Sequence, residues 1–296
     1  MWAACRRRAQ EEIAREVPGA YVSFVSCDVS SLREVGRFAD DYRRQHEKLD
    51  ILAMIAGTFS TDFKKSDEGF ETTLANNYLG HFYLLHLLLP IIEAAAPSRL
   101  LWMGSAFEQL GRMHWDDLGG ETAADTSLDK YCSSSFTPQA KGETATDTSL
   151  DNYCSANLMC IMEAQEVQRR LRARNADVDV FTMHPGLTNS GLYDKPSWWH
   201  PVTWVTVPGA RLLGQSPARG AISTVHCATA PDLQGKGWGY YGCPYLGVLA
   251  INVLQDRQFR PFNKWAHDKE AQRRLYEETA DLIESKIGGP LPNRLA

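Results

Sequence analysis

The stretch Leu49-Asp50-Ile51-Leu52-Ala53-Met54-Ile55-Ala56-Gly57 decides the fold, because it is an apolar run that only Asp50 interrupts and a glycine closes. A short apolar run bounded by turn residues is typical of a strand buried in a parallel sheet. A helical pattern follows, in which apolar residues recur at the 3.6-residue period of one helix face: Phe70, Leu74, Tyr78, Phe82, Leu85 and Leu89. This part of the chain therefore predicts a strand followed by a long helix.

The same alternation extends in both directions from this run. Further strands are expected at 3–5 (the end of a strand), 21–25, 99–103 and 178–183. Further helices are expected at 9–17, 31–46, 153–174, 217–228 and 265–287. Ser30 or Ser31 is a suitable N-cap for the second of these helices, and Gly288-Gly289-Pro290 ends the last. Strands alternating with helices predict an α/β fold with a Rossmann-like, doubly wound parallel sheet, which we expect to fill one domain over residues 1–296.

The composition limits the function classes. The chain has 296 residues and a net charge of −5, so no basic surface for nucleic acid is implied. Its seven cysteines contain no CxxC pair, which favours reduced thiols and predicts a cytoplasmic protein. The first residues lack the apolar run of a secretory signal, and the apolar stretch from Tyr78 to Ile92 is shorter than the roughly 20 residues that span a bilayer.

Residues 107–151 interrupt the alternation and contain an internal repeat. The segment 120–133, which reads GETAADTSLDKYCS, recurs at 142–155 as GETATDTSLDNYCS. Two copies are too few for a solenoid of stacked repeats. We therefore expect a duplicated surface insert at about 107–151.

Ligands of parallel α/β sheets bind beyond the carboxyl ends of the strands, so the residues that follow each strand are the ones most informative about function. They resemble the short-chain dehydrogenase/reductases, and most closely their retinol-dehydrogenase-like branch. The motifs that carry this resemblance are Cys27-Asp28-Val29-Ser30, the run 49–57, the NxxGHF segment at 77–82, the strand 99–105 that ends in Ser105, Tyr153 at the start of a helix, and His184-Pro185-Gly186. Each motif alone is weak evidence, whereas their order and spacing together are specific.

The resemblance implies hydride transfer between NADP(H), or alternatively NAD(H), and a lipophilic alcohol or carbonyl compound. It implies that Tyr153 exchanges a proton with the substrate oxygen and that Ser105 hydrogen-bonds it, with Asn77 and the residue at position 157 completing a catalytic group. The residues implied for cofactor binding are Arg6, Asp28, Val29, Ala56, Gly57, Pro185, Gly186 and Thr188. No metal ligand is implied.

The chain departs from the family pattern in three places. The family's first strand and its TGxxxGxG turn have no counterpart in it, so we expect a sheet without that strand and weak cofactor binding. The family's active-site lysine is replaced by Asn157, and an uncharged amide cannot lower the pKa of a phenol from its reference of about 10. The family's NNAG segment reads Met54-Ile55-Ala56-Gly57.

The duplication supplies a second candidate tyrosine, Tyr131, followed at the lysine offset by Ser135. We expect Tyr153 to hold the catalytic position, because it leads into an apolar helix, whereas Pro138 would stop a helix after Tyr131.

Several alternatives stay open at this point. The chain is an oxidoreductase, a catalytically inactive relative with a binding or regulatory role, or a truncated product without function. Two interpretations are open for the three arginines at 6–8: they bind the 2′-phosphate of NADP, or they begin a solvent-exposed helix. Trp198, Trp199 and Trp204 cover a lipophilic substrate, pack in the core or lie at a membrane surface. The oligomeric state is not predicted.

Overall fold

A five-stranded sheet forms the centre of the molecule in the computed structural model, which describes residues 2–60, 63–121, 149–190, 208, 211–242 and 257–296. Its strands lie in the order β1-β2-β3-β4-β5, which is also their order along the chain. They are β1 (Ile51–Met54), β2 (Ser98–Met103), β3 (Val178–His184), β4 (Gly239–Gly242) and β5 (Arg257–Phe259). The first four strands are parallel, and β5 pairs with β4 in the antiparallel sense. The expected α/β fold with a mainly parallel sheet is confirmed.

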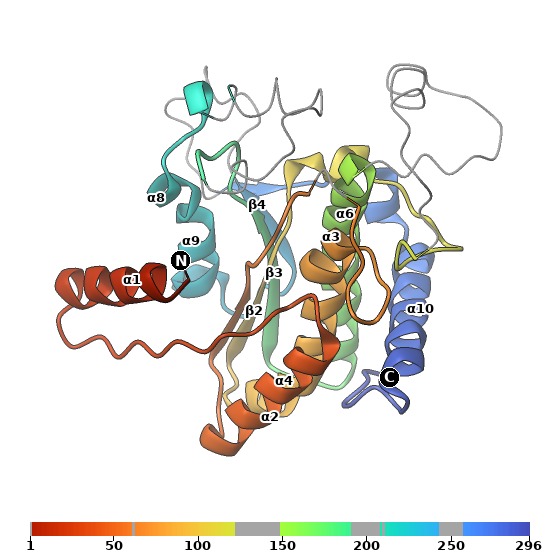
Figure 1. Cartoon of the computed structure of the whole chain (residues 1–296). Coiled ribbons are helices and arrows are strands. Elements are labelled where there is room, and N and C mark those ends of the chain that lie inside the picture. Colours follow the sequence, from red (N-terminus) through yellow and green to blue (C-terminus); the bar gives the residue numbers. More distant parts are fainter. Residues whose placement is uncertain (1, 61–62, 122–148, 191–207, 209–210, 243–256) are drawn as a thin grey trace.

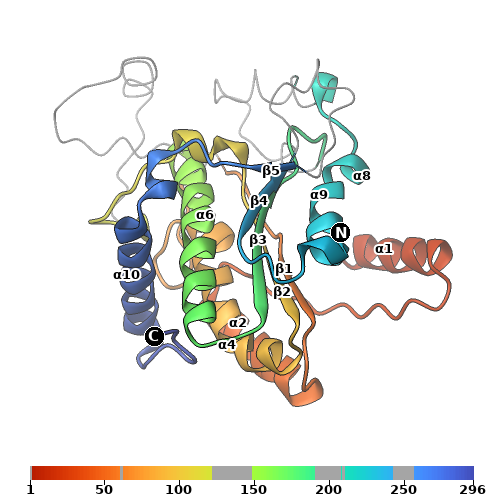
Figure 2. The same cartoon turned by 180° about the vertical axis from the view of Figure 1, so that it is seen from behind.

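Helices cover both faces of this sheet, as Figures 1 and 2 show. One face carries α2 (Leu32–Gln45), α4 (Gly80–Ala94) and α6 (Ser149–Ala173), with α10 (Lys269–Ile287) packed on the outer side of α6. The opposite face carries α9 (Ile222–Thr229), which follows the short helix α8 (Pro217–Gly220). The described residues also form three 3-10 turns: η2 (Ala106–Leu110), η4 (Pro231–Leu233) and η5 (Lys264–His267).

The helices create two apolar layers of different size. The larger layer lies between the sheet and α2, α4, α6 and α10, and it includes the fully buried side chains of Tyr78, Trp102 and Tyr276. The smaller layer lies under α9 and is built around Leu101, Phe181 and Met183. Alternation along β2 explains this division, because Leu101 points to one layer while Leu100 and Trp102 point to the other.

The long helix expected after β1 is present and contains one turn of π-helix. It begins with α3 (Thr72–Leu74), widens into the π-turn η1 (Ala75–Leu79) and continues as α4. Its backbone passes very close to the preceding chain at Gly80, where a Cβ atom would lie 1.9 Å from the carbonyl oxygen of Val29. Only glycine therefore fits at this crossing.

The N-terminal segment differs from its expectation. Residues 3–5 do not end a strand, because they lie within helix α1 (Trp2–Glu16), which extends the helix expected at 9–17. The sequence of α1 is rich in Ala, Arg and Glu, which are strong helix formers. Residues 21–25 form no strand and pair with no strand among the described residues, and Tyr21 is 94% exposed. Figure 1 shows α1 projecting from the side of the molecule.

Both ends of the expected insert are packed into the folded domain. Glu108, Leu118, Gly119 and Gly120 are buried, and residues 149–151 belong to helix α6. Residues 122–148, which contain Tyr131 and most of the duplicated segment, lie outside the described residues, so the insert itself remains a prediction.

Candidate functional site

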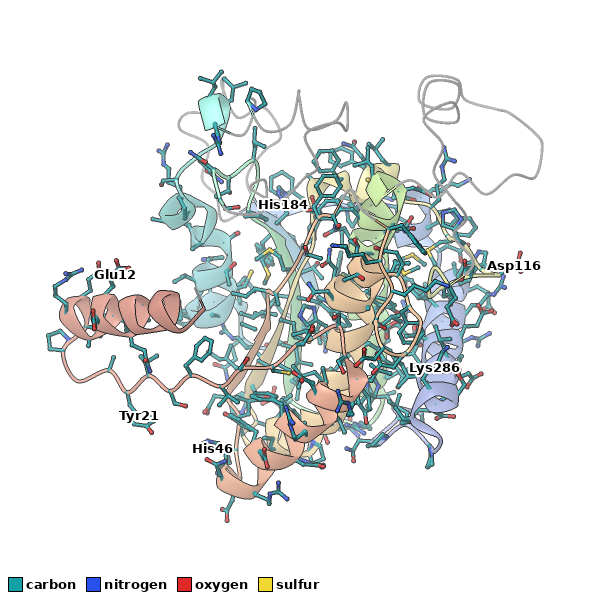
Figure 3. The ribbon with its side chains drawn as sticks, in the orientation of Figure 1. Glu12, Tyr21, His46, Asp116, His184 and Lys286 are labelled. Atoms are coloured by element: carbon teal, nitrogen blue, oxygen red, sulfur yellow. The ribbon has the colours of Figure 1, made fainter. Side chains whose placement is uncertain are left out.

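The expected site residues gather where the parallel strands end. The segment 55–58 follows β1, Gly104 and Ser105 follow β2, and Pro185 and Gly186 follow β3. Figure 3 shows His184, the last residue of β3, at this end of the sheet. Helix α6 contacts β2, β3 and the turn η2, so its first turns are brought to the same edge. This is the edge at which parallel α/β sheets bind ligands.

Ser105 begins the turn that leaves β2. Its Oγ accepts a hydrogen bond of 3.2 Å from the backbone N–H of Phe107, so Ser105 is the N-cap of η2. The side chain is partly exposed rather than buried. The hydroxyl of Ser105 is therefore held in place by this bond and can still be reached by a small molecule.

Tyr153 lies in the second turn of α6, one turn later than the helix opening expected for it. Its ring contacts two other aromatic rings edge to face, with centroid separations of 5.3 Å to Phe59 and 6.2 Å to Phe107. Phe59 is buried in the loop after β1, and Phe107 belongs to η2. The two phenylalanines link Tyr153 to the ends of β1 and β2, including the turn that holds Ser105.

Sequence reasoning did not single out Phe59 or Phe107. A signal for both was nevertheless present, because each lies within a few residues of a strand end, where ligand-binding residues of such sheets are found.

Asn157, in the position of the family's lysine, turns back on its own helix. Its Nδ2 donates a hydrogen bond of 2.7 Å to the backbone carbonyl of Tyr153, one turn earlier. The side chain is 5% exposed. The amide is therefore committed to the backbone of α6, and it brings no charge near the phenol of Tyr153.

The Asn77 side chain ties the π-turn η1 to the loop after β1. Its Oδ1 accepts the backbone N–H of Thr58 at 2.8 Å, and its Nδ2 donates to the carbonyl of Thr58 at 2.9 Å. Asn76 adds a third bond, from its Nδ2 to Oδ1 of Asn77 at 3.0 Å. The clamp fixes the backbone of Thr58, directly after Ala56 and Gly57, which are exposed at the strand end.

The backbone carbonyl of Asn77 contacts two side chains, one from its own helix and one from α6. Nδ1 of His81 lies 3.2 Å from it, and Sγ of Cys160 on α6 donates to it at 3.3 Å. Burial lowers the pKa of His81 to about 4, so its imidazole is neutral near pH 7. The bond from Cys160 thereby connects the π-turn, which carries Asn77, to α6, the helix that carries Tyr153.

The turn after β3 is rigid and compact. The backbone N–H of Gly186 donates to Nδ1 of His184 at 3.2 Å, and burial lowers the pKa of this imidazole to about 4. Gly186 has φ = 68°, a left-handed conformation that favours glycine. Oγ1 of Thr188 donates to the carbonyl of Pro185 at 3.1 Å. Pro185 and Gly186 therefore lie in a turn that hydrogen bonds hold at the end of β3, and Thr188 is bonded within that turn.

A second clamp that sequence reasoning missed supports η2 from the side of β5. The buried carboxylate of Glu108 accepts the backbone N–H groups of Phe262 and Asn263 at 2.8 and 3.2 Å. In return, Nδ2 of Asn263 donates to the carbonyls of Glu108 and Gly111 at 2.9 and 2.8 Å. This reciprocal bonding fixes the turn that carries Ser105 and Phe107.

The residues expected at the adenine end are arranged less favourably for a cofactor. Oδ1 of Asp28 accepts the backbone N–H of Ser30 at 3.0 Å and its hydroxyl at 2.7 Å, so this carboxylate shapes its own turn. The backbone of Val29 packs against Gly80. Arg6 lies in helix α1 and not at a strand end, which corrects the placement on which its contact with a 2′-phosphate depended.

The described residues thus fit the nicotinamide end of a dinucleotide and not its phosphate end. Ser105, Pro185 and Gly186 follow strands at the edge that α6 reaches with Tyr153, and Ala56 and Gly57 are exposed after β1. None of the described strand ends carries a glycine-rich phosphate turn.

Comparisons with known proteins show which family the chain resembles in sequence and fold. The family model for enoyl-(acyl carrier protein) reductase matches residues 3–140. Human retinol dehydrogenase 11 is 26% identical over 288 residues, covering 96% of this chain and 77% of that protein. Human retinol dehydrogenase 14 is 30% identical over 223 residues, covering 73% of this chain and 56% of that protein. A short-chain dehydrogenase from Salmonella enterica has the same fold, with a TM-score of 0.51 and 14% identity over 79% of each chain.

Within the described ranges, no helix has the length and the apolar character that crossing a membrane requires.

Proposed function

Because the chain belongs to the short-chain dehydrogenase/reductase family, in its retinol-dehydrogenase-like branch, we propose that it is an oxidoreductase that interconverts a lipophilic alcohol and its carbonyl compound. The observation that carries this proposal is the position of Tyr153. Its phenol stands between Phe59 and Phe107 at the strand-end edge that also presents Ser105. A phenol and a hydroxyl at one edge of an apolar-walled site suit proton exchange with a bound oxygen.

In this proposal each described residue has one task. Tyr153 gives a proton to the carbonyl oxygen in the reducing direction and takes it back in the oxidising direction. Ser105 hydrogen-bonds the same oxygen and so orients it toward the phenol. Asn77 keeps the loop after β1 in place through its two bonds to Thr58.

A nicotinamide cofactor, when bound, supplies the hydride. The described residues that would hold its nicotinamide end are Ala56, Gly57, Pro185 and Gly186, and we propose NADP(H) as the partner, with NAD(H) as the alternative. Asn157 gives the phenol no charge, so we expect slow turnover.

The apolar surroundings of Tyr153 support a lipophilic substrate. Phe59 and Phe107 contact its ring, and two further apolar side chains that follow strand ends, Leu110 on η2 and Leu187 after β3, are 55% and 38% exposed. The two human relatives are retinol dehydrogenases by name, and retinol is a lipophilic alcohol. We propose that the protein is cytoplasmic. Its lipophilic substrate would reach it either from solution or from a membrane surface. The tryptophans at 198, 199 and 204, which were expected to cover it, lie outside the described residues.

Steady-state assays test the proposal with a matched pair of tyrosine variants. NADPH-dependent reduction of a long-chain aldehyde is measured at millimolar cofactor for the wild type, Tyr153→Phe and Tyr131→Phe. We expect Tyr153→Phe to lower kcat by about 10²-fold or more, the usual range for lost general acid catalysis, and Tyr131→Phe to leave it unchanged. Loss of activity in Tyr131→Phe alone would reject the assignment of Tyr153.

A second function is favoured by the bond of Asn157 to the backbone of α6. A relative that binds the same ligands without turning them over needs no charged group at this position. Substrate binding by calorimetry without any turnover, in wild type and in Tyr153→Phe alike, would support this binding role over the oxidoreductase.

A further inference from the structure

Glu163 is a buried carboxyl in the middle of helix α6, outside the site described above. It is 0% exposed and lies where α6 meets η1 and α10. The Tyr78 hydroxyl on η1 is 3.1 Å from its Oε2, and the same hydroxyl is 2.8 Å from Oγ1 of Thr279 on α10. Among the described residues, Oε1 of Glu163 has no hydrogen-bond partner. One carboxyl and one phenol therefore join three elements inside the core.

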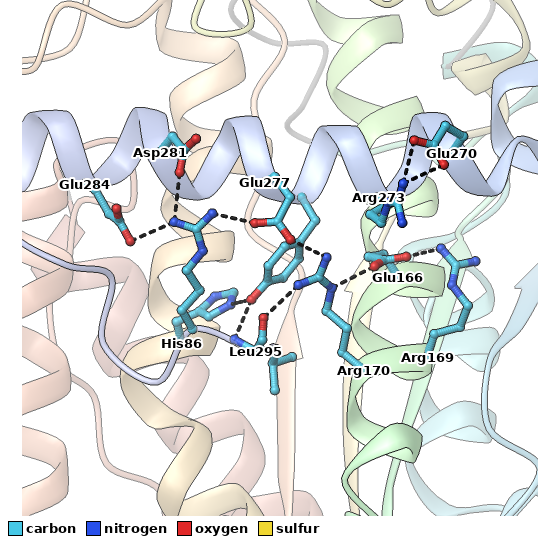
Figure 4. A network of polar contacts seen from close by, with 12 residues as sticks. His86, Glu166, Arg169, Arg170, Glu270, Arg273, Glu277, Asp281, Glu284 and Leu295 are labelled. Carbon is cyan, nitrogen blue, oxygen red and sulfur yellow. Dashed lines mark hydrogen bonds and ion pairs between the residues drawn. The ribbon is translucent and has the colours of Figure 1, made fainter.

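The nearest positive charge is already balanced by other groups. The guanidinium of Arg170 donates to Glu166 at 2.7 Å and to Glu277 at 2.6 Å, and it also donates to the carbonyl of Leu295 at 2.7 Å. Figure 4 shows this arrangement, in which Arg170 points toward α10 and the C-terminal residues. The titratable and charged groups that act on Glu163 from the surrounding elements are Tyr78, Cys160, Glu166, Arg170, Tyr276 and Glu277.

An ionised carboxylate at this place would be costly. Removing a charge from water without a hydrogen-bonded cation is strongly unfavourable, and the group responds by binding a proton. Burial accordingly raises the pKa of Glu163 well above its usual value, and the negative charges of Glu166 and Glu277 act in the same direction. The hydrogen bond from Tyr78 and the charge of Arg170 oppose this rise without cancelling it.

We propose that Glu163 carries a proton in the folded protein, and that this proton is taken up on folding and holds the junction of α6, η1 and α10 together. The junction matters for the site because α6 carries Tyr153 and η1 carries Asn77. Cys160, one turn before Glu163, donates to the carbonyl of Asn77. The proposal does not depend on the oxidoreductase function, since it concerns the stability of the junction alone.

The sign of the pH dependence follows from linkage. In the unfolded chain the pKa of this glutamate is near its ordinary value of 4.5, and in the folded protein the pKa is higher. Below the unfolded pKa both states are protonated and stability is unaffected. As pH rises above it, the unfolded state alone loses the proton, so the unfolding equilibrium constant grows by up to tenfold per pH unit until the folded pKa is passed.

The test compares urea unfolding of the wild type and Glu163→Gln from about pH 5 to about pH 8, the window above the unfolded pKa. Gln keeps the shape of Glu and stays neutral, and other titrating groups cancel in the ratio of the two unfolding constants. We expect this ratio, wild type over variant, to rise by several-fold to tenfold per pH unit. The matched control is Glu47→Gln, an exposed glutamate, for which the ratio should stay constant.

Infrared spectroscopy of the folded wild type gives a second and direct reading. We expect the carbonyl stretch of a protonated carboxylic acid at neutral pH, and its loss in Glu163→Gln. If Glu163→Gln does not fold, Glu163→Met replaces it in both experiments. A pH-independent ratio of unfolding constants, or a spectrum in which replacing Glu163 removes no such band, would overturn the proposal.

Discussion

The side-chain amide of Asn157 donates to the backbone carbonyl of Tyr153 at 2.7 Å. Asn157 follows the candidate catalytic tyrosine by one helical turn, and this bond ties its side chain to the backbone of the same helix. A lysine at this position would have no reason to turn back on the carbonyl. Its ammonium group would hydrogen-bond to water, to a ligand or to the phenol of Tyr153. A positive charge near the phenol favours its ionised form and so lowers its pKa.

We therefore expect Asn157→Lys to raise the rate of carbonyl reduction and to shift its pH profile to lower pH. A phenol with a pKa near the reference of about 10 is poorly matched to work near neutrality, whereas a nearby cation lowers that value. The measurement is kcat against pH for both proteins, and general acid–base catalysis sets the expected gain at about 10²-fold or more. Asn157→Gln is the matched control and should not gain activity. Equal rates for wild type and Asn157→Lys would show that Asn157 is no defect.

Two glycines on neighbouring helices should respond oppositely to alanine. At Gly80 a Cβ atom would lie 1.9 Å from the backbone oxygen of Val29, and backbone yields little, so we expect Gly80→Ala to destabilise by about 1–3 kcal/mol. At Gly36 on α2 the nearest atom is the Tyr83 hydroxyl at 3.7 Å, an ordinary contact. Gly36→Ala should stabilise by up to about 1 kcal/mol, since alanine favours helix. Chemical unfolding of both variants checks the pair, and a stable Gly80→Ala would contradict the close crossing.

His86 should make the protein sensitive to acid. It is fully buried, with Nδ1 2.8 Å from the carbonyl of Phe82 and Nε2 2.9 Å from the hydroxyl of Tyr276 (Figure 4), and burial lowers its pKa from 6.5 to about 4. The unfolded chain takes up a proton below about pH 6.5 while the folded protein does not, so stability falls from pH 6.5 toward pH 4. The shift corresponds to about 3 kcal/mol.

Urea unfolding at about pH 7 and about pH 4.5, either side of the midpoint of this loss, checks the acid sensitivity. His86→Gln should lose less stability on acidification than the wild type, whereas His46→Gln, at an exposed position, should behave as the wild type does. An unchanged acid response in His86→Gln would show that His86 is not the group responsible.

Cofactor affinity should be low in the 296-residue chain. Arg6 lies in α1, the carboxylate of Asp28 is bonded to Ser30, and no described strand end offers a glycine-rich phosphate turn. Isothermal calorimetry with NADPH and NADH should give dissociation constants weaker than micromolar, a level that corresponds to about −8 kcal/mol. A micromolar constant for either nucleotide would reveal phosphate contacts that the described residues do not supply.

Much of the fold was predictable because its strands and helices are marked by local patterns. The run 49–57 gave β1, the period of Phe70 and Leu74 gave the long helix, and Ser31 and Gly288 cap helices as expected. The N-terminal helix was only partly recognised, because residues 3–5 were interpreted through the family pattern although their own propensity is helical. The π-turn η1 was not predictable, because the spacing of apolar residues along the sequence does not distinguish a π-turn from an ordinary α-helical turn.

The candidate site was predictable at the positions that follow strands, and less so where side chains meet across the fold. Ser105, Pro185 and Gly186 could be placed from strand ends alone. The bonds of Glu108 to Asn263 join residues more than 150 positions apart, and the bond of Glu163 to Tyr78 joins two helices. No spacing rule in the sequence predicts such pairs, because they depend on how the elements pack.

The most direct test of the oxidoreductase proposal follows the hydride itself. Wild type and Tyr153→Phe are incubated with a long-chain aldehyde and NADPH that carries deuterium at the transferable C4 position, at millimolar concentration, and the alcohol product is analysed by mass spectrometry. We predict one deuterium at the carbinol carbon with the wild type and a yield lower by about 10²-fold or more with Tyr153→Phe. No deuterated alcohol from the wild type, or equal yields from both proteins, would contradict the proposal that Tyr153 serves an oxidoreductase.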